Sequence, residues 1–427
     1  MSEWQQVPLG EFADVQNGYA FKSQEFSDRG IPVIKIKNVA SGKITWDEIR
    51  FFSGSTQNLS KFLITKGDIL IAMTGSHVTQ ESSAVGKVAR YSSDISSLLN
   101  QRVGKVYSKD LGRLDNDFLY YFLIQPVTQY KLGVAASGSA NQANISPSQI
   151  KGLRIDLPLI SEQRETATLL ACLDRKIENL RRQNKTLERI AQTLFKHWFV
   201  DFEFPNKDGK PYKSSGGAME RSELREIPAG WRIGTLEDVV DIFTGYPFKS
   251  DLYSFDSGIR VVRGENVSLG FLRWDMEKRW EHDLESYLDY FLQKDDYVIA
   301  MDGSRVGRNR SIILSSDLPL ILAQRVARLR VKNPIFAGYI NTFLNQDRFE
   351  RYVDFIKTGT SIPHISSTQI KNFECFIPTQ DVVSAFEKFY QSWVKKVSLH
   401  LGQIQTLTKT RDVLLPQLMS GKLRLTE

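Results

Sequence analysis

The stretch "NGYAFKS" at residues 17–23 returns as "TGYPFKS" at 244–250, with Gly, Tyr, Phe, Lys and Ser in the same places. The two glycines, Gly18 and Gly245, are 227 positions apart (245 − 18). A phrase that recurs within one chain indicates internal duplication, and a duplication determines how the rest of the sequence is organised. The remainder of the chain therefore has to be compared with itself at a similar offset.

Further matches follow in the same order along the two halves. Six of ten residues agree between "GDILIAMTGS" at 67–76 and "DDYVIAMDGS" at 295–304, and five of nine agree between "ISPSQIKGL" at 145–153 and "ISSTQIKNF" at 365–373. The tripeptide "QRV" occurs at 101–103 and again at 324–326. The offset is 227–228 in the first matches (245 − 18 and 295 − 67) and 220 in the last (365 − 145), so the sequence predicts a tandem duplication with small insertions and deletions.

Each copy begins with strand-like sequence and contains one helix-like segment. Short runs such as "VIKIKNV" and "RVARLRV" alternate apolar and polar residues and are separated by glycine and aspartate, which is typical of strands and turns. The segments 115–125 and 336–346 have the apolar content of a helix. Each globular half is therefore predicted to be a mixed α and β domain.

The end of each copy changes to a helical period. Apolar residues recur every three or four positions in both stretches, as in a heptad pattern: Leu170, Leu173, Ile177, Leu180, Leu187, Leu194 and Trp198 in the first, and Tyr390, Trp393, Val397, Ile404, Leu407, Leu414 and Leu418 in the second. Two helices of roughly 40 residues, each about 60 Å long, are predicted over about 161–200 and 381–419. Asn184 occupies one such position, where it either fixes the register of the helix pair or lies on a polar face.

The fold class predicted is α+β, with two similar globular domains separated by two long antiparallel helices in a pseudo-two-fold tandem duplication. The expected division is a first domain at 1–156, a first spacer helix at 157–200, a polar linker at 201–226, a second domain at 227–378 and a second spacer helix at 379–427. The linker is expected from its proline, glycine and serine content.

The composition limits the classes of protein to which this chain can belong. The net charge of +7 and the excess of three basic residues in each helical stretch (8 − 5 at 161–200 and 7 − 4 at 379–427) permit nucleic-acid binding without requiring it. No apolar run approaches the length of a membrane span, and the N-terminus lacks the features of a secretory signal. With only two cysteines, Cys172 and Cys375, the chain is expected to be cytoplasmic, with no membrane association.

No catalytic or metal-binding pattern is found in the sequence. There is no GxxxxGK[ST] phosphate loop, HExxH motif, paired Cys-x-x-Cys or dinucleotide glycine signature, and the five histidines lack ligand spacing. The chain is therefore expected to be non-catalytic and to need neither a cofactor nor a metal.

Polar and basic loops are the candidate DNA-binding sites. Lys22 and Lys249 of the repeated phrase suit contact with a phosphate, although a glycine turn with a solvated lysine explains them equally well. "SRVGRNR" at 304–310 places Arg305 and Arg308 on a loop that differs from its counterpart, so the two copies could recognise different bases. A solvated basic loop is the alternative. The full set of candidate residues is Lys22, Ser23, Lys37, Asn38, Ser76, His77, Arg102, Ser139, Asn141, Lys249, Ser250, Arg263, Asn266, Ser304, Arg305, Arg308, Arg325, Thr360 and Ser361.

Three longer segments carry a family resemblance: "LPLISEQRETATLLACLDRKIENLRRQNKTLERIAQTLFKHWFVDFEF" at 157–204, "EIPAGWRIGTLEDV" at 226–239 and "LLPQLMSGKLRL" at 414–425. Together with the "GYxFKS" phrases, they resemble the specificity subunit of type I restriction-modification systems over nearly the whole chain. The resemblance implies two target-recognition domains that each read one half of a bipartite, asymmetric site in double-stranded DNA. It also implies two helices that dock two methyltransferase subunits, with restriction subunits in the full complex, and no catalytic residues.

Two other classes of function are kept as alternatives. One is a nuclease or methyltransferase that acts alone, which methylation or cleavage by the purified chain would reveal. The other is a structural protein that dimerises through its helices and does not bind DNA, which a salt-dependent shift of duplex DNA would distinguish.

Overall fold

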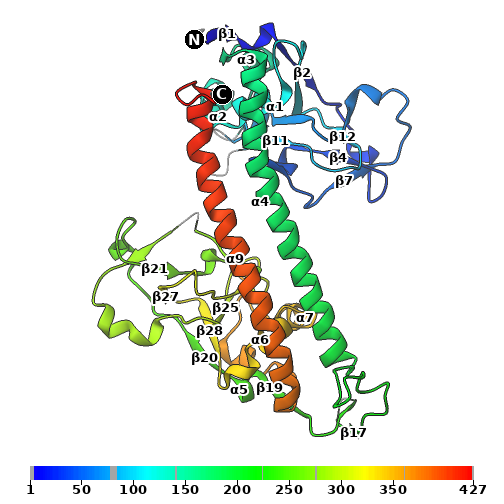
Figure 1. The fold of residues 1–427 in the computed structure, drawn as a ribbon, viewed down its shortest axis with the longest axis vertical. Helices are drawn as coiled ribbons and strands as arrows, with labels where there is room; N and C mark the ends of the chain where they lie inside the picture. Colours follow the sequence, from blue (N-terminus) through cyan, green and yellow to red (C-terminus); the bar gives the residue numbers. More distant parts are fainter. Residues whose placement is uncertain are drawn as a thin grey trace. The chain divides into compact units, whose positions relative to one another are not determined.

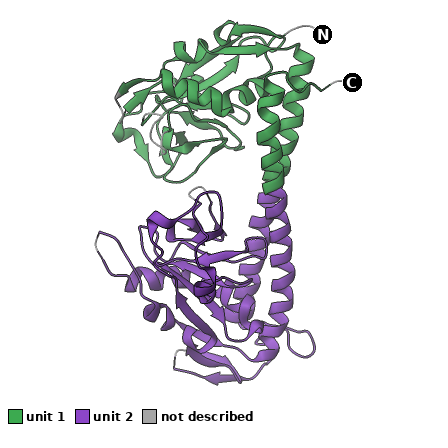
Figure 2. Ribbon diagram, turned by 90° about the vertical axis from the view of Figure 1, so that its left-hand side faces the viewer, with its two compact units in different colours: residues 1–178, 405–427 green, residues 179–404 purple. Residues whose placement is uncertain are grey.

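The computed structural model describes residues 4–76, 84–139, 142–223, 225–274, 277–359 and 361–425. The chain forms two compact units: unit 1 contains Met1–Glu178 and Gln405–Glu427, and unit 2 contains Asn179–Ile404 (Figure 2). The boundary between them lies within two long helices, so each unit includes a part of each helix.

Unit 1 is built on a four-stranded antiparallel sheet in the order β11-β9-β13-β2. Its strands are β2 (Ala13–Asn17), β9 (Ile69–Ala72), β11 (Val88–Arg90) and β13 (Val103–Ser108). All four residues of β9 are buried, because successive side chains of a strand point to opposite faces and both faces are covered. Ile69 and Ile71 pack in one core with helix α1 (Asn116–Ile124), whereas Leu70 and Ala72 pack in a second core.

A mixed sheet in the order β3-β7-β4-β12-β8 lies beside this core, and its β4 and β12 are parallel. Its strands are β3 (Phe26–Ser27), β4 (Ile31–Ile34), β7 (Arg50–Phe52), β8 (Leu63–Ile64) and β12 (Ser97–Leu99). A small sheet in the order β10-β15-β14 consists of β10 (Thr74–Gly75), β14 (Ser137–Ser139) and β15 (Gln142–Asn144). The remaining elements of the first half are β1 (Gln5–Pro8), β5 (Val39–Ala40), β6 (Lys43–Ile44), α2 (Pro126–Ala135), α3 (Pro147–Lys151) and β16 (Arg154–Leu157).

Unit 2 repeats the strand order of unit 1. Its four-stranded antiparallel sheet has the order β20-β28-β25-β26, which corresponds to β2-β13-β9-β11. A second sheet, β24-β21-β27, again contains a parallel pair, between β21 and β27. The strands of these two sheets are β20 (Val240–Thr244), β21 (Ile259–Val262), β24 (Arg279–Trp280), β25 (Tyr297–Ala300), β26 (Arg310–Ile312), β27 (Leu320–Leu322) and β28 (Val326–Val331).

The remaining elements of unit 2 complete its core and edges. They are β17 (Met219–Arg221), β18 (Glu226–Pro228), β19 (Arg232–Thr235), α5 (Leu236–Val239), β22 (Val267–Ser268), β23 (Phe271–Leu272), α6 (Ala337–Leu344), α7 (Asp347–Ile356), α8 (Ser367–Lys371) and β29 (Glu374–Ile377). Helix α8 begins with a capping box between Ser366 and Gln369, and α3 of unit 1 begins with the equivalent box between Ser146 and Gln149. The motif "ISxxQIK" recurs because it starts the same short helix in both copies.

The two long helices are α4 (Ile160–Phe195) and α9 (Gln380–Met419), and they lie side by side in Figure 1. Within unit 1, Asp174 of α4 forms an ion pair with Arg411 at 2.9 Å, and Leu170 shares a core with Leu418. Within unit 2, Asn184 contacts His400 and Phe195 contacts Phe386. As residue numbers rise along α4, the residue numbers of the contacting residues on α9 fall. The two helices are therefore antiparallel within each unit.

Asn184 lies in the contact between the helices. Its Oδ1 is 2.7 Å from Nδ1 of His400, which is 3% exposed. Of the two positions that the sequence left open for Asn184, the structure supports the one inside the helix pair. Its partner is a histidine of the other helix, which the heptad pattern did not identify.

Residues 201–226 differ from the polar linker that their composition indicated. Phe202 and Phe204 are buried in the main core of unit 2, where both contact the ring of Trp231. Tyr212 stacks on Phe204 at 4.5 Å. The described part of this segment is therefore packed onto unit 2, because three aromatic side chains anchor a stretch that is otherwise rich in glycine, serine and lysine. No helix within the described residues is long and apolar enough to span a membrane.

Candidate nucleic-acid interface

The repeated phrase is fixed by backbone contacts to the segment before the "QRV" tripeptide. A side chain on Gly18 would place its Cβ 2.2 Å from the carbonyl oxygen of Asn100, and one on Gly245 would lie 2.1 Å from that of Ala323. The amide of Gln101 donates to the carbonyl of Tyr19 at 2.8 Å, and that of Gln324 donates to Tyr246 at the same distance. Only glycine allows this approach, so the phrase recurs as part of the scaffold.

The phrase turns its aromatic residues inward and its polar residues outward. Phe21 and Phe248 are 9% and 6% exposed and belong to small aromatic cores. Lys22 and Lys249 are exposed, each beside an exposed serine, Ser23 or Ser250, that starts a 3-10 turn. Inward aromatic side chains and exposed lysines fit the alternative of a glycine turn with a solvated lysine, and contact of these lysines and serines with phosphate remains a proposal.

Two predicted contact residues, Asn38 and Asn266, are instead interior residues of loops, with exposed fractions of 0% and 1%. Their Oδ1 atoms accept hydrogen bonds at 3.1 Å from the amides of Lys35 and Arg263. Their Nδ2 atoms donate at 3.0 Å to the carbonyls of Thr45 and Arg273. These asparagines shape equivalent loops and cannot reach a base without unfolding them, so the expectation of direct contact is corrected here.

The neighbours of these asparagines are held by local carboxylates. Lys37 forms an ion pair with Glu48, and this ammonium holds the pKa of the Glu48 carboxyl below its usual value. Arg263 pairs with Glu265 and lies over the ring of Tyr253. Both cations sit on loops at the end of equivalent strands, β4 and β21.

The "QRV" arginines, Arg102 and Arg325, are exposed in both units. Nη1 of Arg102 donates to Oδ1 of Asn144 at 3.2 Å and to Oγ1 of Thr74 at 3.4 Å. Nε of Arg325 lies 3.7 Å from Oδ2 of Asp302. The sequence singled out the arginines but not these partners, of which Thr74 and Asn144 lie on β10 and β15 and Asp302 lies just after β25 (Tyr297–Ala300).

The loop 304–310 presents exposed Ser304, Arg305 and Arg308. Arg308 pairs with Asp354 at 3.3 Å and with Glu350 at 3.7 Å, both on α7. The Lys357 ammonium, with Arg308 nearby, holds the pKa of the Asp354 carboxyl below its usual value. Arg310 of the same sequence motif is buried at 1% exposure, so only part of this basic run faces solvent.

Two of the other candidates lie at the small sheet of unit 1, where Ser76 follows β10 and Ser139 ends β14. In unit 2, Ser361 is exposed. His77, Asn141 and Thr360 lie outside the described residues.

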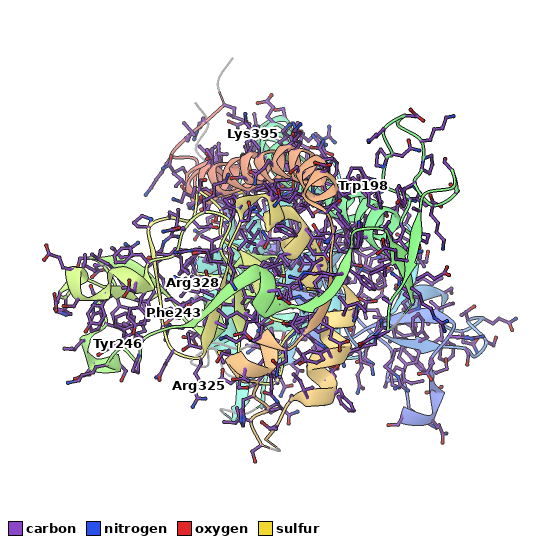
Figure 3. All side chains as sticks on the ribbon, turned by 90° about the horizontal axis from the view of Figure 1, so that it is seen from below. Trp198, Phe243, Tyr246, Arg325, Arg328 and Lys395 are labelled. Atoms are coloured by element: carbon purple, nitrogen blue, oxygen red, sulfur yellow. The ribbon has the colours of Figure 1, made fainter. Side chains whose placement is uncertain are left out.

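Figure 3 shows on which side of unit 2 one candidate residue, Arg325, lies. Arg325 lies on the side opposite Lys395, which is on α9. Tyr246 and Phe243 both contact the ring of Tyr290, and Arg328 lies over the ring of Phe243 at 5.0 Å. Arg325 therefore lies on the side of unit 2 away from this part of the long helix.

The site as described is suited to binding, with polar and basic side chains on short loops supported by two sheets. Among the described residues, no group of three or more His, Cys, Asp or Glu side chains is arranged to hold a metal ion. Arginine, lysine and serine recur at equivalent places on duplicated loops, which is compatible with nucleic-acid binding by both copies.

Comparison with known proteins assigns the chain to one family. A family profile described as "Type I restriction modification DNA specificity domain" matches residues 1–189 and 228–393. The chain therefore belongs to the family of type I restriction-modification specificity subunits.

Relatives cover almost the whole chain at low identity. The MjaIX specificity subunit of a type I restriction enzyme from Methanocaldococcus jannaschii is 25% identical over 94% of this chain and 92% of its own length. The HindI specificity subunit from Haemophilus influenzae is 21% identical over 99% of this chain and its own full length. A crystal structure of a type I S subunit from M. genitalium has a TM-score of 0.56 at 17% identity, over 97% of this chain and 96% of that one, which shows a shared fold.

Proposed function

We propose that this chain reads a bipartite, asymmetric site in double-stranded DNA, with one half of the site bound by each of two target-recognition domains at residues 1–156 and 227–378. The two domains are a tandem duplication related by a pseudo-two-fold. Residues 157–200 and 379–427 act as the spacer helices between them, and residues 201–226 connect the copies.

One observation carries this proposal. Both units use the same strand order and the same glycine-to-backbone anchor, whereas the side chains on the loops differ. Arg102 is held by Thr74 and Asn144, but its counterpart Arg325 lies against Asp302. A shared scaffold with different loop chemistry is what two readers of different half-sites require.

The long helices are proposed to dock two methyltransferase subunits, one per repeat, and through them restriction subunits. Apolar side chains left exposed on the helices support this role: Ile190 and Leu399 in unit 2 are 48% and 56% exposed, and Val413 in unit 1 is 59% exposed. Native mass spectrometry of the chain with the methyltransferase of its own system should show two methyltransferase subunits per chain. A single one under all conditions would contradict the proposal.

The chain itself is proposed to be non-catalytic and to act in the cytoplasm without a cofactor. Methylation and cleavage would then belong to the partner subunits. The purified chain should neither methylate nor cleave DNA, and either activity would show that it is an enzyme in its own right.

The alternative is a structural protein that dimerises through its helices. The apolar stripes argue against it, because Leu170 and Leu180 are buried within one chain, at 0% and 2% exposure. A duplex-binding experiment with the methyltransferase complex separates the two functions. Binding that weakens steeply with salt supports DNA recognition through phosphate contacts, and absence of binding supports the structural role.

Domain replacement tests the proposed function directly. Residues 1–156 are exchanged for the corresponding domain of a relative, and the methylated sequence is mapped in cells that contain the complex. One half of the site should change while the other half remains. A change in both halves, or in neither, would refute the two-reader function.

A further inference from the structure

The two "QRV" arginines are equivalent in the scaffold but are held by different chemistry. Arg102 precedes β13 and Arg325 precedes β28, and both strands are central in their sheets. Each arginine contacts a side chain whose backbone forms a bridge within the same unit. Thr74 of β10 pairs with Asn144 of β15 in unit 1, and Asp302 forms an isolated bridge with His364 in unit 2.

In unit 1, two neutral side chains that are hydrogen-bonded to each other, Thr74 and Asn144, fix Arg102. Thr74 Oγ1 donates to Asn144 Oδ1 at 2.9 Å, and Arg102 Nη1 donates to both oxygens. Thr74 is 8% exposed, so its hydroxyl is a buried anchor. Asn144 Oδ1 already accepts two bonds, which leaves its amide without the free acceptor that a bidentate contact with adenine requires. Asn144 is therefore suited to position Arg102 and not to read a base itself.

In unit 2, a carboxylate replaces this neutral pair. Nε of Arg325 faces Asp302, and the Arg325 side chain is 66% exposed. The backbone of Arg325 has a φ of 68°, in the left-handed region that arginine rarely adopts. His364 also pairs with Thr358 through two backbone hydrogen bonds of 2.8 and 3.0 Å. In addition, Oγ1 of Thr358 lies 3.0 Å from Nε2 of His364. Asp302 is bridged to His364, so these contacts of His364 help to hold the segment around Asp302.

We propose that Arg102 and Arg325 each contact a guanine in their own half-site, and that they present different edges of the guanidinium. This inference rests on the proposed function and adds Thr74, Asn144 and Asp302 as positioning residues. Arginine binds O6 and N7 of guanine through two parallel N–H groups. Among the described residues, Nη1 of Arg102 is engaged by Thr74 and Asn144, which leaves Nε and Nη2 as the pair for guanine. Within the same part of the chain, Nε of Arg325 faces Asp302, which leaves Nη1 and Nη2 as its pair.

The experiment uses the full chain in complex with the methyltransferase of its own system, which selects duplexes from a randomised pool. Arg102→Ala should reduce the preference for guanine at one position of the first half-site by roughly 5- to 150-fold. Thr74→Val and Asn144→Ala should reduce it at the same position by less, and Thr74→Ser should restore it. Arg325→Ala and Asp302→Asn should act at one position of the second half-site only.

Exposed arginines outside the loops serve as controls. Arg154→Ala in unit 1 and Arg232→Ala in unit 2 should leave both half-sites unchanged; Arg232 also pairs with a carboxylate, Asp238, at 3.3 Å and is 58% exposed. Equal weakening on all sequences with a shallower salt dependence would assign the arginines to phosphates and overturn the inference. So would an unchanged guanine preference in Arg102→Ala and Arg325→Ala. A wild-type complex that selects no bipartite sequence would refute the proposed function itself.

Discussion

Arg310 shows how unit 2 holds a charge in its interior beneath the candidate loop. Its guanidinium is 1% exposed, donates to the carbonyl of Gly307 at 2.6 Å and pairs with Glu350 at 3.0 Å. Removing one partner of a buried ion pair leaves the other charge without compensation. Glu350→Ala should therefore lower the free energy of unfolding by about 3–5 kcal/mol.

Urea unfolding of the full chain, followed by tryptophan fluorescence, measures this loss. Five of the seven tryptophans lie in unit 2, so the signal reports mainly on that unit. Glu237→Ala is the matched control, because Glu237 pairs with Lys371 at 3.0 Å on the surface. It should change stability by less than about 1 kcal/mol. Equal shifts for the two variants would show that Glu350 does not compensate a buried charge.

Arg308 lies two residues before Arg310, and its side chain is 53% exposed. It forms ion pairs with Asp354 and Glu350. We expect Arg308→Ala to weaken recognition of the second half-site only, by roughly 1–3 kcal/mol at one base pair. Binding to duplexes that vary one position at a time measures this. Uniform weakening with a shallower salt slope would indicate a phosphate contact, and unchanged binding would leave Arg308 as a solvated residue.

At the scale of elements, the helices give the most direct test of chain direction. Asp174 and Arg411 pair within unit 1, so neighbouring positions on α4 and α9 should also be close. Cysteines placed at Leu173 and Leu414, in a Cys172→Ser background that removes the exposed native thiol, should form a crosslink within one chain. Non-reducing electrophoresis measures it. Efficient crosslinking of Leu173→Cys with Trp393→Cys would instead indicate parallel helices.

The elements also show why some features followed from the sequence and others did not. The long helices are predictable because their apolar residues repeat over many turns, and a period is a local signal. The burial of Phe202 and Phe204 depends on Trp231, which lies on a later segment, so no local pattern reveals it. In the same way, Asn38 and Asn266 are polar loop residues by sequence, and only the folded loop shows that their amides point inward.

The candidate site follows the same distinction. Arg102 could be singled out because its tripeptide recurs, but its acceptors are 28 and 42 positions away along the chain. Comparing the copies position by position indicates that Thr74 and Asp302 differ, without showing that either touches an arginine. Repetition therefore predicts the scaffold well, and three-dimensional pairing supplies the chemistry that distinguishes the copies.

For the whole molecule, the decisive property is whether the two units act as independent readers. Thr74 and Asn144 contact Arg102, and Asp302 contacts Arg325, so within the described residues the two arginines share no partner. Effects at sites without shared partners usually add within about 0.3–0.5 kcal/mol. The double variant Arg102→Lys, Arg325→Lys should therefore lose binding free energy equal to the sum of the single losses.

Titration of the full methyltransferase complex with its selected duplex, at one fixed salt concentration, measures the four affinities of this cycle. The conservative lysine keeps the positive charge but removes the planar pair of N–H groups, so a loss reflects geometry more than charge. If the double variant has the same affinity as the weaker-binding single variant, the second substitution costs no further binding free energy. Loss of one arginine contact would then already abolish the contact in the other half-site. The units would then be a single coupled reader, and exchange of one domain would alter both halves of the recognised sequence.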